Sequence, residues 1–340
     1  MSAVIFDKVS IVFGNKPKTA LPLMDAGQER GEIQTATGQV LGVHDCSLTV
    51  DRGEILVLMG LSGSGKSTLL RAVNGLNPVV RGTVQVNDGD GMVDVTNANA
   101  ATLRRMRQSR IAMVFQQFGL LPWRSVRENV GLGLELAGQS KSERHETVDK
   151  QLALVGLSDW ADRKVGDLSG GMQQRVGLAR AFCTEAPILL MDEPFSALDP
   201  LIRTRLQDEL LDLQRDLKRT IIFVSHDLDE AFKLGDRIAI MEGGRIVQCG
   251  TPREIFTHPA DDYVADFVAH MNPLGVLCAH DVMEPASGKH TAFVPANEPI
   301  QSVMKNFARS GKSIGVKDGD KVIGQITRDT VLAKLLGPRS

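Results

Sequence analysis

Residues 54–76 read EILVLMGLSGSGKSTLLRAVNGL and combine three local patterns. An apolar run that ends at Met59 predicts a strand, and the apolar spacing over 69–76 predicts a helix. Between them, GLSGSGKST at 60–68 follows the pattern G-x-x-x-x-G-K-S/T. Glycines in this pattern let backbone N–H groups approach phosphate oxygens without a Cβ clash. A glycine-rich turn between a strand and a helix therefore predicts a phosphate-binding loop.

The polar residues of this loop have distinct expected roles. Lys66 is expected to neutralise the β- and γ-phosphates of a nucleotide, and the Ser67 hydroxyl to ligate Mg²⁺. The other residues expected to surround the phosphates are Gly60, Ser62, Gly63, Ser64, Gly65 and Thr68. Kinases, GTPases, helicases and transport ATPases all contain such a loop, so it identifies the ligand and leaves the reaction open.

Strands and helices alternate along most of the chain. Strand patterns occur at 3–13, 46–59, 82–95, 111–115, 188–192, 220–225 and 237–250, the last with a turn at Gly243-Gly244. Helix patterns occur at 69–76, across much of 124–165, and at 172–184, 201–218 and 228–234. This alternation predicts an α/β fold with a mainly parallel sheet. Residues 14–43, between the first two strands, are either a surface insertion or two short helices, one beginning at Thr19 and one centred on Glu29.

The segment ILLMDEP at 188–194 predicts hydrolytic chemistry. Its apolar residues indicate a fully buried strand, which leaves Asp192 and Glu193 at the exposed carboxyl end. Asp192 can hold Mg²⁺ directly or through water, and Glu193 can polarise an attacking water. The alternative is that one of the two acids only caps the following turn.

The segment LSGGMQQR at 168–175 precedes a predicted helix. Ser169, Gly170 and Gly171 at a helix start offer backbone N–H groups, a hydroxyl and the positive end of the helix dipole, which together suit a second phosphate site. Alone, these residues would indicate only a helix N-cap. Their position shortly before a buried strand that ends in Asp-Glu favours the phosphate site.

With these motifs in order, the chain resembles the ABC-type ATPases over about residues 3–270. In that resemblance 60–68 corresponds to Walker A, 168–175 to the signature, 191–193 to the end of Walker B and 196–199 to the D-loop. The resemblance implies a P-loop NTPase fold with a parallel-sheet core, an N-terminal antiparallel β part and a helical subdomain at about 117–180. It also implies hydrolysis of ATP with Mg²⁺.

Three further residues take roles through the same resemblance. Gln116 follows the strand IAMVF and corresponds to the glutamine that reaches Mg²⁺ and the attacking water. His226 follows TIIFVS and corresponds to the histidine that donates to the γ-phosphate. Phe13 stands where the family stacks an aromatic ring on adenine; its alternative role is ordinary core packing.

The family completes its ATP sites across a dimer, because the signature and the phosphate loop lie on opposite faces of one domain. This chain holds one motif set, so the resemblance implies a second copy or a partner ATPase. The residues expected to act on the partner's ATP are Ser169, Gly170, Gly171, Gln173 and Asp199.

Several non-transport branches of the family do not fit. Only about a hundred residues separate Lys66 from Ser169, too few for a long coiled coil, and CxxC pairs are absent. What remains is an ATP-binding subunit whose membrane permease is another polypeptide, acting indirectly with a substrate-binding protein. The apolar stretch Leu120–Trp123 resembles the permease-docking region of bacterial importers; the alternative is a core cluster of the helical subdomain.

Finer resemblance points to the importers of quaternary-amine osmoprotectants. The long segment 14–43 and Leu61, where most importers have Pro, resemble the glycine betaine, choline and proline betaine group. The sequences VHDCSLTV and RAVNGLNPV most resemble the corresponding segments of choline importer ATPases. The competing interpretation is a regulatory, non-transport ABC ATPase with a C-terminal sensor domain.

Residues 272–340 are predicted to form a second, small α+β domain after the ATPase domain at 1–271. The patterns give β-α-β-β-α, which resembles a single CBS motif. So small a unit is expected to need a partner surface, either the same unit of a second copy or its own ATPase domain.

Composition limits the classes of partner and the cellular location that we expect for this chain. With 39 Lys+Arg against 41 Asp+Glu, the net charge is −2, which excludes a strongly basic nucleic-acid binder. Neither a signal-peptide pattern nor a run of 18 apolar residues occurs. The four cysteines are expected to be small buried residues of a reduced protein. We therefore expect a cytoplasmic location, at the inner face of the plasma membrane through the permease.

Overall fold

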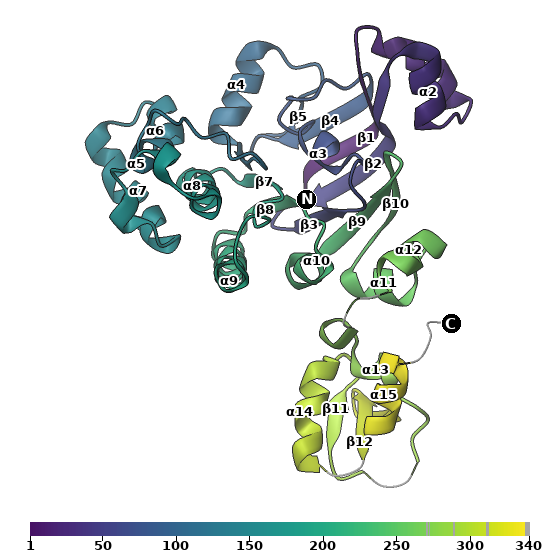
Figure 1. The fold of residues 1–340 in the computed structure, drawn as a ribbon. Helices are drawn as coiled ribbons and strands as arrows, with labels where there is room; N and C mark the ends of the chain where they lie inside the picture. Colours follow the sequence, from purple (N-terminus) through teal and green to yellow (C-terminus); the bar gives the residue numbers. More distant parts are fainter. Residues whose placement is uncertain (270, 272, 288–289, 311–312, 337–340) are drawn as a thin grey trace. The chain divides into compact units, whose positions relative to one another are not determined.

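The computed structural model describes residues 1–269, 271, 273–287, 290–310 and 313–336. Two compact units are present (Figure 1): the first comprises Met1–Asp227 with Leu234–Cys249, and the second Leu228–Lys233 with Gly250–Ser340. The division at residues 271 and 272 that the sequence suggests stays a prediction.

An antiparallel sheet forms the N-terminal part of the first unit. Its strand order is β2-β1-β4-β5. The strands are β1 Ser2–Phe13, β2 Val40–Asp51, β4 Arg81–Asn87 and β5 Met92–Asp94. The predicted strand region 46–59 is interrupted, because Gly53 adopts a left-handed φ of 75° and the chain turns before it enters the second sheet.

A second sheet of six strands forms the centre of the unit, in the order β10-β9-β3-β8-β7-β6. The strands are β3 Ile55–Met59, β6 Ile111–Val114, β7 Ile188–Asp192, β8 Thr220–Val224, β9 Arg237–Glu242 and β10 Arg245–Gly250. The pairs from β9 to β6 are parallel, as expected. Every residue of β3, β7 and β8 is buried, because both faces of a parallel sheet are covered. The carboxyl ends of these three strands lie at one edge of the sheet.

Helices α5 to α8 gather beside the sheets and match the predicted helical subdomain (Figure 1). They are α5 Val126–Val130, α6 Leu132–Leu136, α7 Lys141–Leu154 and α8 Gly170–Cys183, with the short helices η2 Ser158–Trp160 and η3 Val165–Asp167. The unit also contains α3 Lys66–Leu70, α4 Ala100–Ser109 and α9 Pro200–Leu217. The predicted helix at 69–76 is wrong in extent: α3 ends at Leu70, and the next turns close by tighter bonds such as Val73 N–H to the Leu70 carbonyl.

The segment between β1 and β2 is helical and has its own small core. It forms η1 Pro17–Ala20, α1 Leu21–Asp25 and α2 Arg30–Thr37. The buried side chains that pack together here are Val12, Ala20, Met24, Ile33 and Leu41. The segment is therefore helical, as one of the two interpretations predicted, but that prediction is wrong in extent: the helices begin at Pro17, Leu21 and Arg30 rather than at Thr19, and Glu29 is the N-cap of α2 rather than its centre.

The second unit contains a three-stranded sheet in the order β11-β12-β13, with β11 parallel to β12 and β13 antiparallel to it. Its elements are α10 Leu228–Leu234, α11 Pro252–Thr257, α12 Asp262–Phe267, η4 Pro273–Gly275, α13 Ala279–Val282, β11 Phe293–Pro295, α14 Ile300–Ser310, β12 Ser313–Asp318, β13 Lys321–Thr327 and α15 Arg328–Leu336. The order from β11 to α15 is β-α-β-β-α as predicted, but the first strand was predicted at 280–285, which overlaps α13, and is instead Phe293–Pro295. Its core also includes Phe256 and Met271, and the likeness to a CBS motif stays a prediction.

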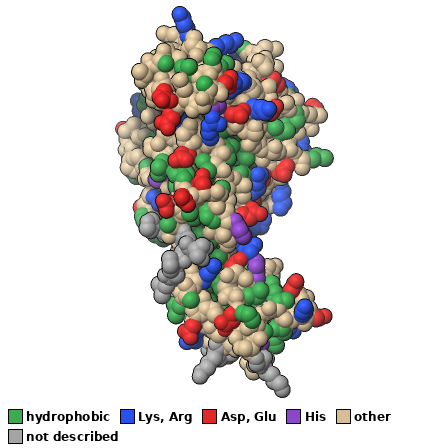
Figure 2. Space-filling view, turned by 90° about the vertical axis from the view of Figure 1, so that its right-hand side faces the viewer, with side chains coloured by type: hydrophobic (Ala, Val, Ile, Leu, Met, Phe, Trp, Pro, Cys, Tyr) green, Lys and Arg blue, Asp and Glu red, His purple; other side chains and the backbone are tan. Residues whose placement is uncertain are grey.

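Surface and cysteine properties agree with the composition. Basic and acidic side chains are interspersed over the face in Figure 2. Across the described ranges, none of the helices combines the length and the apolar character needed to cross a bilayer. Cys46 and Cys183 are buried as expected, whereas Cys249 and Cys278 are only partly buried.

Candidate nucleotide-binding site

The loop after β3 needs glycine at two positions. Gly60 has a φ of 137° and Gly65 a φ of 101°. A Cβ on Gly60 would lie 2.1 Å from the carbonyl oxygen of Met241, and one on Gly65 would lie 2.6 Å from that of Gly42. Because no other residue fits, the backbone keeps the sharp turn that exposes its N–H groups.

Lys66 begins α3 with its ammonium inside this loop. Its Nζ donates to the carbonyl oxygens of Gly60 and Leu61, at 2.9 Å each. Burial lowers the pKa of Lys66, and the carboxylates of Glu193 and Asp192 partly oppose that shift. The ammonium is thus held by neutral carbonyls, which leaves its charge available to an anion that enters the loop.

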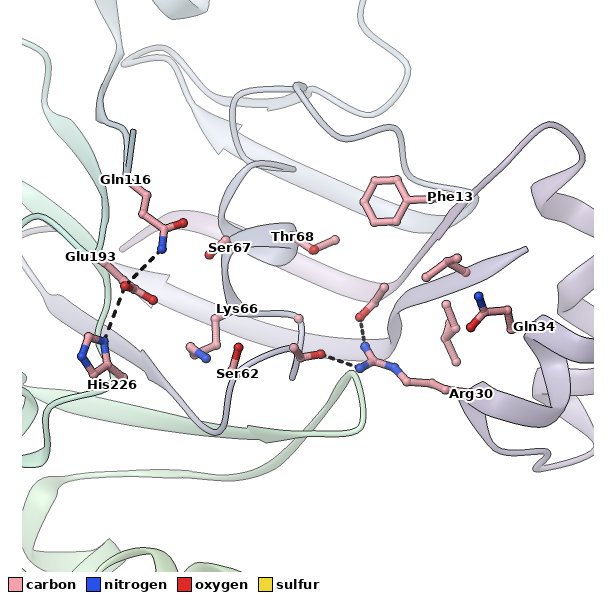
Figure 3. Close-up of a pocket in the computed structure, with 15 residues that line it drawn as sticks. Phe13, Arg30, Gln34, Ser62, Lys66, Ser67, Thr68, Gln116, Glu193 and His226 are labelled. Atoms are coloured by element: carbon pink, nitrogen blue, oxygen red, sulfur yellow. Dashed lines mark hydrogen bonds and ion pairs between the residues drawn. The ribbon is translucent and has the colours of Figure 1, made fainter. Parts of the chain in front are cut away.

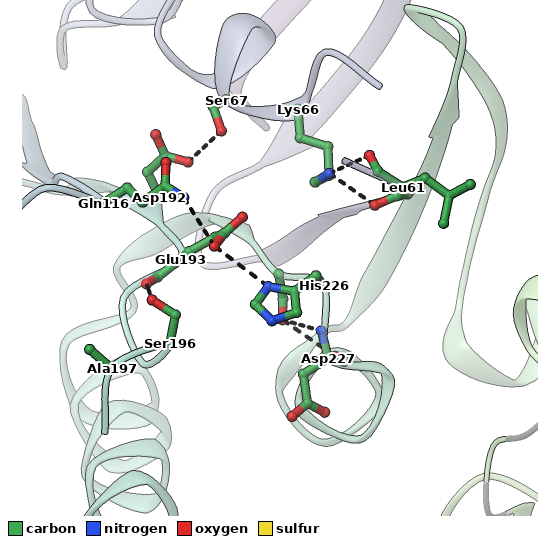
Figure 4. A network of polar contacts seen from close by, with 12 residues as sticks. Leu61, Lys66, Ser67, Gln116, Asp192, Glu193, Ser196, Ala197, His226 and Asp227 are labelled. Carbon is green, nitrogen blue, oxygen red and sulfur yellow. Dashed lines mark hydrogen bonds and ion pairs between the residues drawn. The ribbon is translucent and has the colours of Figure 1, made fainter. Parts of the chain in front are cut away.

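The end of β7 supplies a buried carboxylate beside the loop (Figure 4). Asp192 is fully buried and accepts from the Ser67 hydroxyl at 2.6 Å. Its other oxygen pairs with Arg71 at 2.8 Å. The hydroxyl and carboxylate oxygens of Ser67 and Asp192 are hard donors of the kind that Mg²⁺ prefers, so these residues fit that ion.

Glu193, at the end of β7, contacts side chains that follow the two neighbouring strands, β6 and β8. Its Oε2 accepts from Gln116 Nε2 at 3.2 Å and lies 3.5 Å from His226 Nδ1. Its φ is 48°, a left-handed value that is uncommon for a residue other than glycine. Gln116, Glu193 and His226 follow β6, β7 and β8, so the parallel order of the sheet brings them together (Figure 4).

These side chains open into a cavity of about 620 Å³ (Figure 3). Residues predicted for the site that line it are Phe13, Ser62, Gly63, Gly65, Lys66, Ser67, Thr68, Gln116, Glu193 and His226. Gly60, Ser64 and Asp192 are buried beneath the lining. Phe13 is 38% exposed, so its ring is not part of the interior core. Lining residues that the sequence analysis missed are Arg30, Gln34, Val40, Leu41 and Gly42.

Comparison with known proteins identifies the family of this chain. A family model described as ABC transporter matches residues 43–196. The glycine betaine/proline betaine transport system ATP-binding protein of Salmonella typhimurium is 45% identical over 326 residues, which cover 95% of this chain and 80% of the relative. The chain belongs to the ATP-binding proteins of ABC transporters.

Other relatives of this ABC ATPase carry related names. The glycine betaine transport ATP-binding protein of Bacillus subtilis is 49% identical, with 82% of this chain and 66% of the relative covered. The trimethylamine N-oxide transport system ATP-binding protein of Ruegeria pomeroyi is 42% identical, with 96% and 94% covered. A solved dimeric ATP-binding cassette in a post-hydrolysis state with ADP and Pi has a TM-score of 0.63 and 29% identity, covering 74% of this chain and 99% of that one. As a member of this family, the chain is an ATP hydrolase.

The signature residues of this ABC ATPase lie away from the cavity. Ser169 caps α8 and accepts from the Met172 N–H at 3.4 Å, so its hydroxyl proton remains available to donate. Ser169 and Gly170 are exposed, and Asp199 is exposed at the start of α9. The other predicted residues of this group, Gly171 and Gln173, are half-buried nearby. One copy therefore does not bring its signature and its phosphate loop around one cavity.

Gln174 is a further residue that the sequence analysis missed. Its side chain is buried; Nε2 donates to the Glu193 carbonyl at 3.2 Å, and Oε1 accepts from the Ala197 N–H at 3.0 Å. Both ends of the amide are thus used to hold the loop after β7. The only signal in the sequence was its place one residue after Gln173, which turns its side chain by about 100° around the helix.

The stretch Leu120–Trp123 follows Gln116 on a loop that is firmly held. Buried Asn129 donates to the carbonyls of Leu121 and Ser125 at 3.0 Å and accepts from the Leu121 N–H at 2.8 Å. Trp123 is 68% exposed, although the loop that carries it is fixed. This exposure is at odds with a core role for Trp123, the alternative interpretation.

Proposed function

We propose that this ABC ATPase hydrolyses ATP in the cavity between the phosphate loop and the ends of β6, β7 and β8. Lys66 neutralises the β- and γ-phosphates while backbone N–H groups of the loop hold them. Glu193 polarises the attacking water, Gln116 orients it, and His226 donates to the γ-phosphate. The observation that carries this proposal is the contact of the Glu193 carboxylate with both Gln116 and His226.

At the nucleoside end of the cavity, Phe13 stacks on adenine. Its ring is partly exposed and lines the same cavity as Lys66, which supports this role over core packing. Of the other loop residues, Ser62, Gly63, Ser64, Gly65 and Thr68 surround the phosphates.

Ser67, Asp192 and Gln116 would hold Mg²⁺ with ATP. The ion, when bound, offsets charge on the β- and γ-phosphates. Arg71 already pairs with Asp192 at 2.8 Å, and this pair holds the carboxylate beside the Ser67 hydroxyl.

Two copies of the chain complete two sites. The exposed Ser169, Gly170 and Asp199 would reach the ATP held by the partner's phosphate loop, with Gly171 and Gln173 shaping the approach. These residues do not line the cavity of their own copy, and the solved relative is dimeric; both observations support this arrangement.

We further propose that hydrolysis energises import of a methylated amine through a separate permease. Most of these relatives are named for glycine betaine, proline betaine, carnitine or trimethylamine N-oxide transport, and one for methionine import, which supports a transport role over a regulatory, non-transport ATPase and favours this substrate class. Choline remains the finer prediction. The permease would dock at Leu120–Trp123 and hold the subunit at the cytoplasmic face of the plasma membrane, and a substrate-binding protein would act outside.

Reconstitution tests this function. Proteoliposomes that contain this subunit, its permease and its substrate-binding protein should take up labelled glycine betaine only when ATP is present on the side of this subunit. Unlabelled choline in excess should compete if choline is carried. Uptake that is independent of ATP, or ATP hydrolysis without uptake of any methylated amine, would contradict the transport proposal.

A further inference from the structure

Helix α2, in the segment between β1 and β2, forms one wall of the nucleotide cavity. Arg30 and Gln34 stand one turn apart and both line it (Figure 3). Ile33, which faces another direction, is fully buried against the small core of the same segment. The helix thus has one anchored face and one face that meets the ligand space.

Local sequence fixes this helix in place. Glu29 and Glu32 form a reciprocal capping box at its start. At its end Gly38, with a φ of 68°, closes the helix through its N–H bond to the Gln34 carbonyl at 2.8 Å. The positions of Arg30 and Gln34 are therefore set by a built element rather than by an open loop.

Arg30 reaches from α2 to the phosphate loop (Figure 3). Its guanidinium donates to the Gly63 carbonyl at 2.5 Å and to the Gly42 carbonyl. Both acceptors are neutral backbone carbonyls. Among the described residues Arg30 has no ion pair, and its Nε is buried without a partner. Burial lowers the pKa of Arg30, but a guanidinium stays protonated in proteins. The cavity therefore holds a second cation, beside Lys66, that no carboxylate compensates.

We propose that Arg30 and Gln34 are nucleotide-binding residues contributed by the inserted segment. Arg30 contacts the phosphate chain of bound ATP, and Gln34, one turn farther along α2, contacts the nucleoside. This inference rests on the proposed use of the cavity for ATP. It assigns the segment a part in ligand binding, where the sequence alone allowed only a surface insertion or two short helices.

The competing role for Arg30 is purely structural, as a strap between β2 and the phosphate loop. A strap would act without nucleotide: its loss would lower the melting temperature of the empty protein and affect all ligands alike. A ligand contact instead depends on the phosphates of the ligand and on the positive charge at position 30.

The test compares Arg30→Ala, Arg30→Lys and Gln34→Ala with the wild-type full chain. Lys18→Ala is the matched control, because Lys18 is an exposed cation of the same segment outside the cavity. Affinities for ATP, ADP and adenosine are measured by displacement of a fluorescent ATP analogue, together with KM, kcat and the melting temperature without nucleotide.

We expect Arg30→Ala to raise KM and the Kd values of ATP and ADP by about tenfold, with kcat within about twofold and adenosine affinity unchanged. Arg30→Lys should recover part of the loss. Gln34→Ala should weaken all three ligands by about threefold, and Lys18→Ala none of them. Wild-type affinities in Arg30→Ala, or equal losses for all ligands with a lower melting temperature, would overturn the inference. If the wild-type chain itself binds no ATP, the proposed function has failed instead.

Discussion

The side chain of Gln174 donates a hydrogen bond of 3.2 Å to the carbonyl oxygen of Glu193. Gln174 belongs to α8, which begins with the signature, and Glu193 holds a left-handed φ of 48° at the end of β7. Such a backbone conformation persists only when its surroundings enforce it. The helix that would face the partner's ATP thus also holds the backbone of Glu193, whose carboxylate we propose acts on the chain's own ATP.

Gln174→Leu removes this support while keeping the size of the side chain. It removes the hydrogen bonds of Gln174 with the Glu193 carbonyl and with the Ala197 N–H, although that carbonyl still accepts from the Ser196 hydroxyl at 3.0 Å. The loss of two hydrogen bonds should lower the free energy of unfolding by about 1–3 kcal/mol. We expect kcat to fall about tenfold while ATP affinity is retained, because only the position of Glu193 changes. Gln108→Leu, at an exposed glutamine of α4, is the control. A variant that is less stable but has wild-type kcat would show that Gln174 acts only in packing.

Complementation tests the composite site. Lys66→Ala removes the phosphate contact of one copy, and Ser169→Arg blocks the signature of the other. A mixed dimer then keeps one site with an intact Lys66 and an intact Ser169, so the mixture should hydrolyse ATP faster than either variant alone. Phosphate release against mixing ratio should peak near equal amounts. Normal hydrolysis by Ser169→Arg alone would refute a site built across two copies.

Pairing of the second unit is tested by a surface change. Phe293 and Leu332 are 44% and 47% exposed on that unit, which would suit contact with the same unit of a second copy. Truncation after Met271 is less clean, because Phe256 and Met271 belong to the core of that unit. Leu332→Glu should abolish dimers seen without nucleotide in sedimentation, while dimers driven by ATP persist. If wild type and variant are equally monomeric without ATP, the unit does not pair.

The buried thiols of Cys46 and Cys183 should make the free energy of unfolding depend on pH in the alkaline range. Burial raises the pKa of Cys46 to about 12 and that of Cys183 to about 11. The folded chain therefore keeps these protons above pH 9, where the unfolded chain releases them, so stability falls as pH rises from about 9 toward these values. Between pH 8 and pH 10, Cys46→Ala should lose about 1 kcal/mol less than wild type in urea unfolding. Equal losses would mean that Cys46 is not protected.

Much of the site could be predicted because its parts end consecutive strands. Gln116, Glu193 and His226 each follow a short apolar strand, and the carboxyl ends of parallel strands share one edge. The phosphate loop could also be predicted, because its glycine pattern is visible in the sequence. The structure shows why glycine is needed there: a Cβ at Gly60 or Gly65 would collide with a backbone carbonyl.

The missed residues depend on tertiary packing. Arg30 and Gln34 lie on a helix whose sequence shows caps and one buried position. The local sequence does not indicate that the polar face of this helix lies against the cavity. Gln174 stands in a run of polar residues, and only the fold shows that it is buried. The end of α3 at Leu70 was also missed, because the apolar spacing continues into turns closed by tighter bonds.

The most direct test of hydrolysis in this cavity is phosphate release by Glu193→Gln. The substitution keeps the size of the side chain but removes the carboxylate that polarises water, so turnover should fall on the order of 10²–10⁴-fold. ATP binding should persist, and the ATP-bound variant should double in mass on gel filtration. Glu185→Gln, the same change at an exposed position before β7, should behave as wild type. Near wild-type phosphate release by Glu193→Gln would contradict the account.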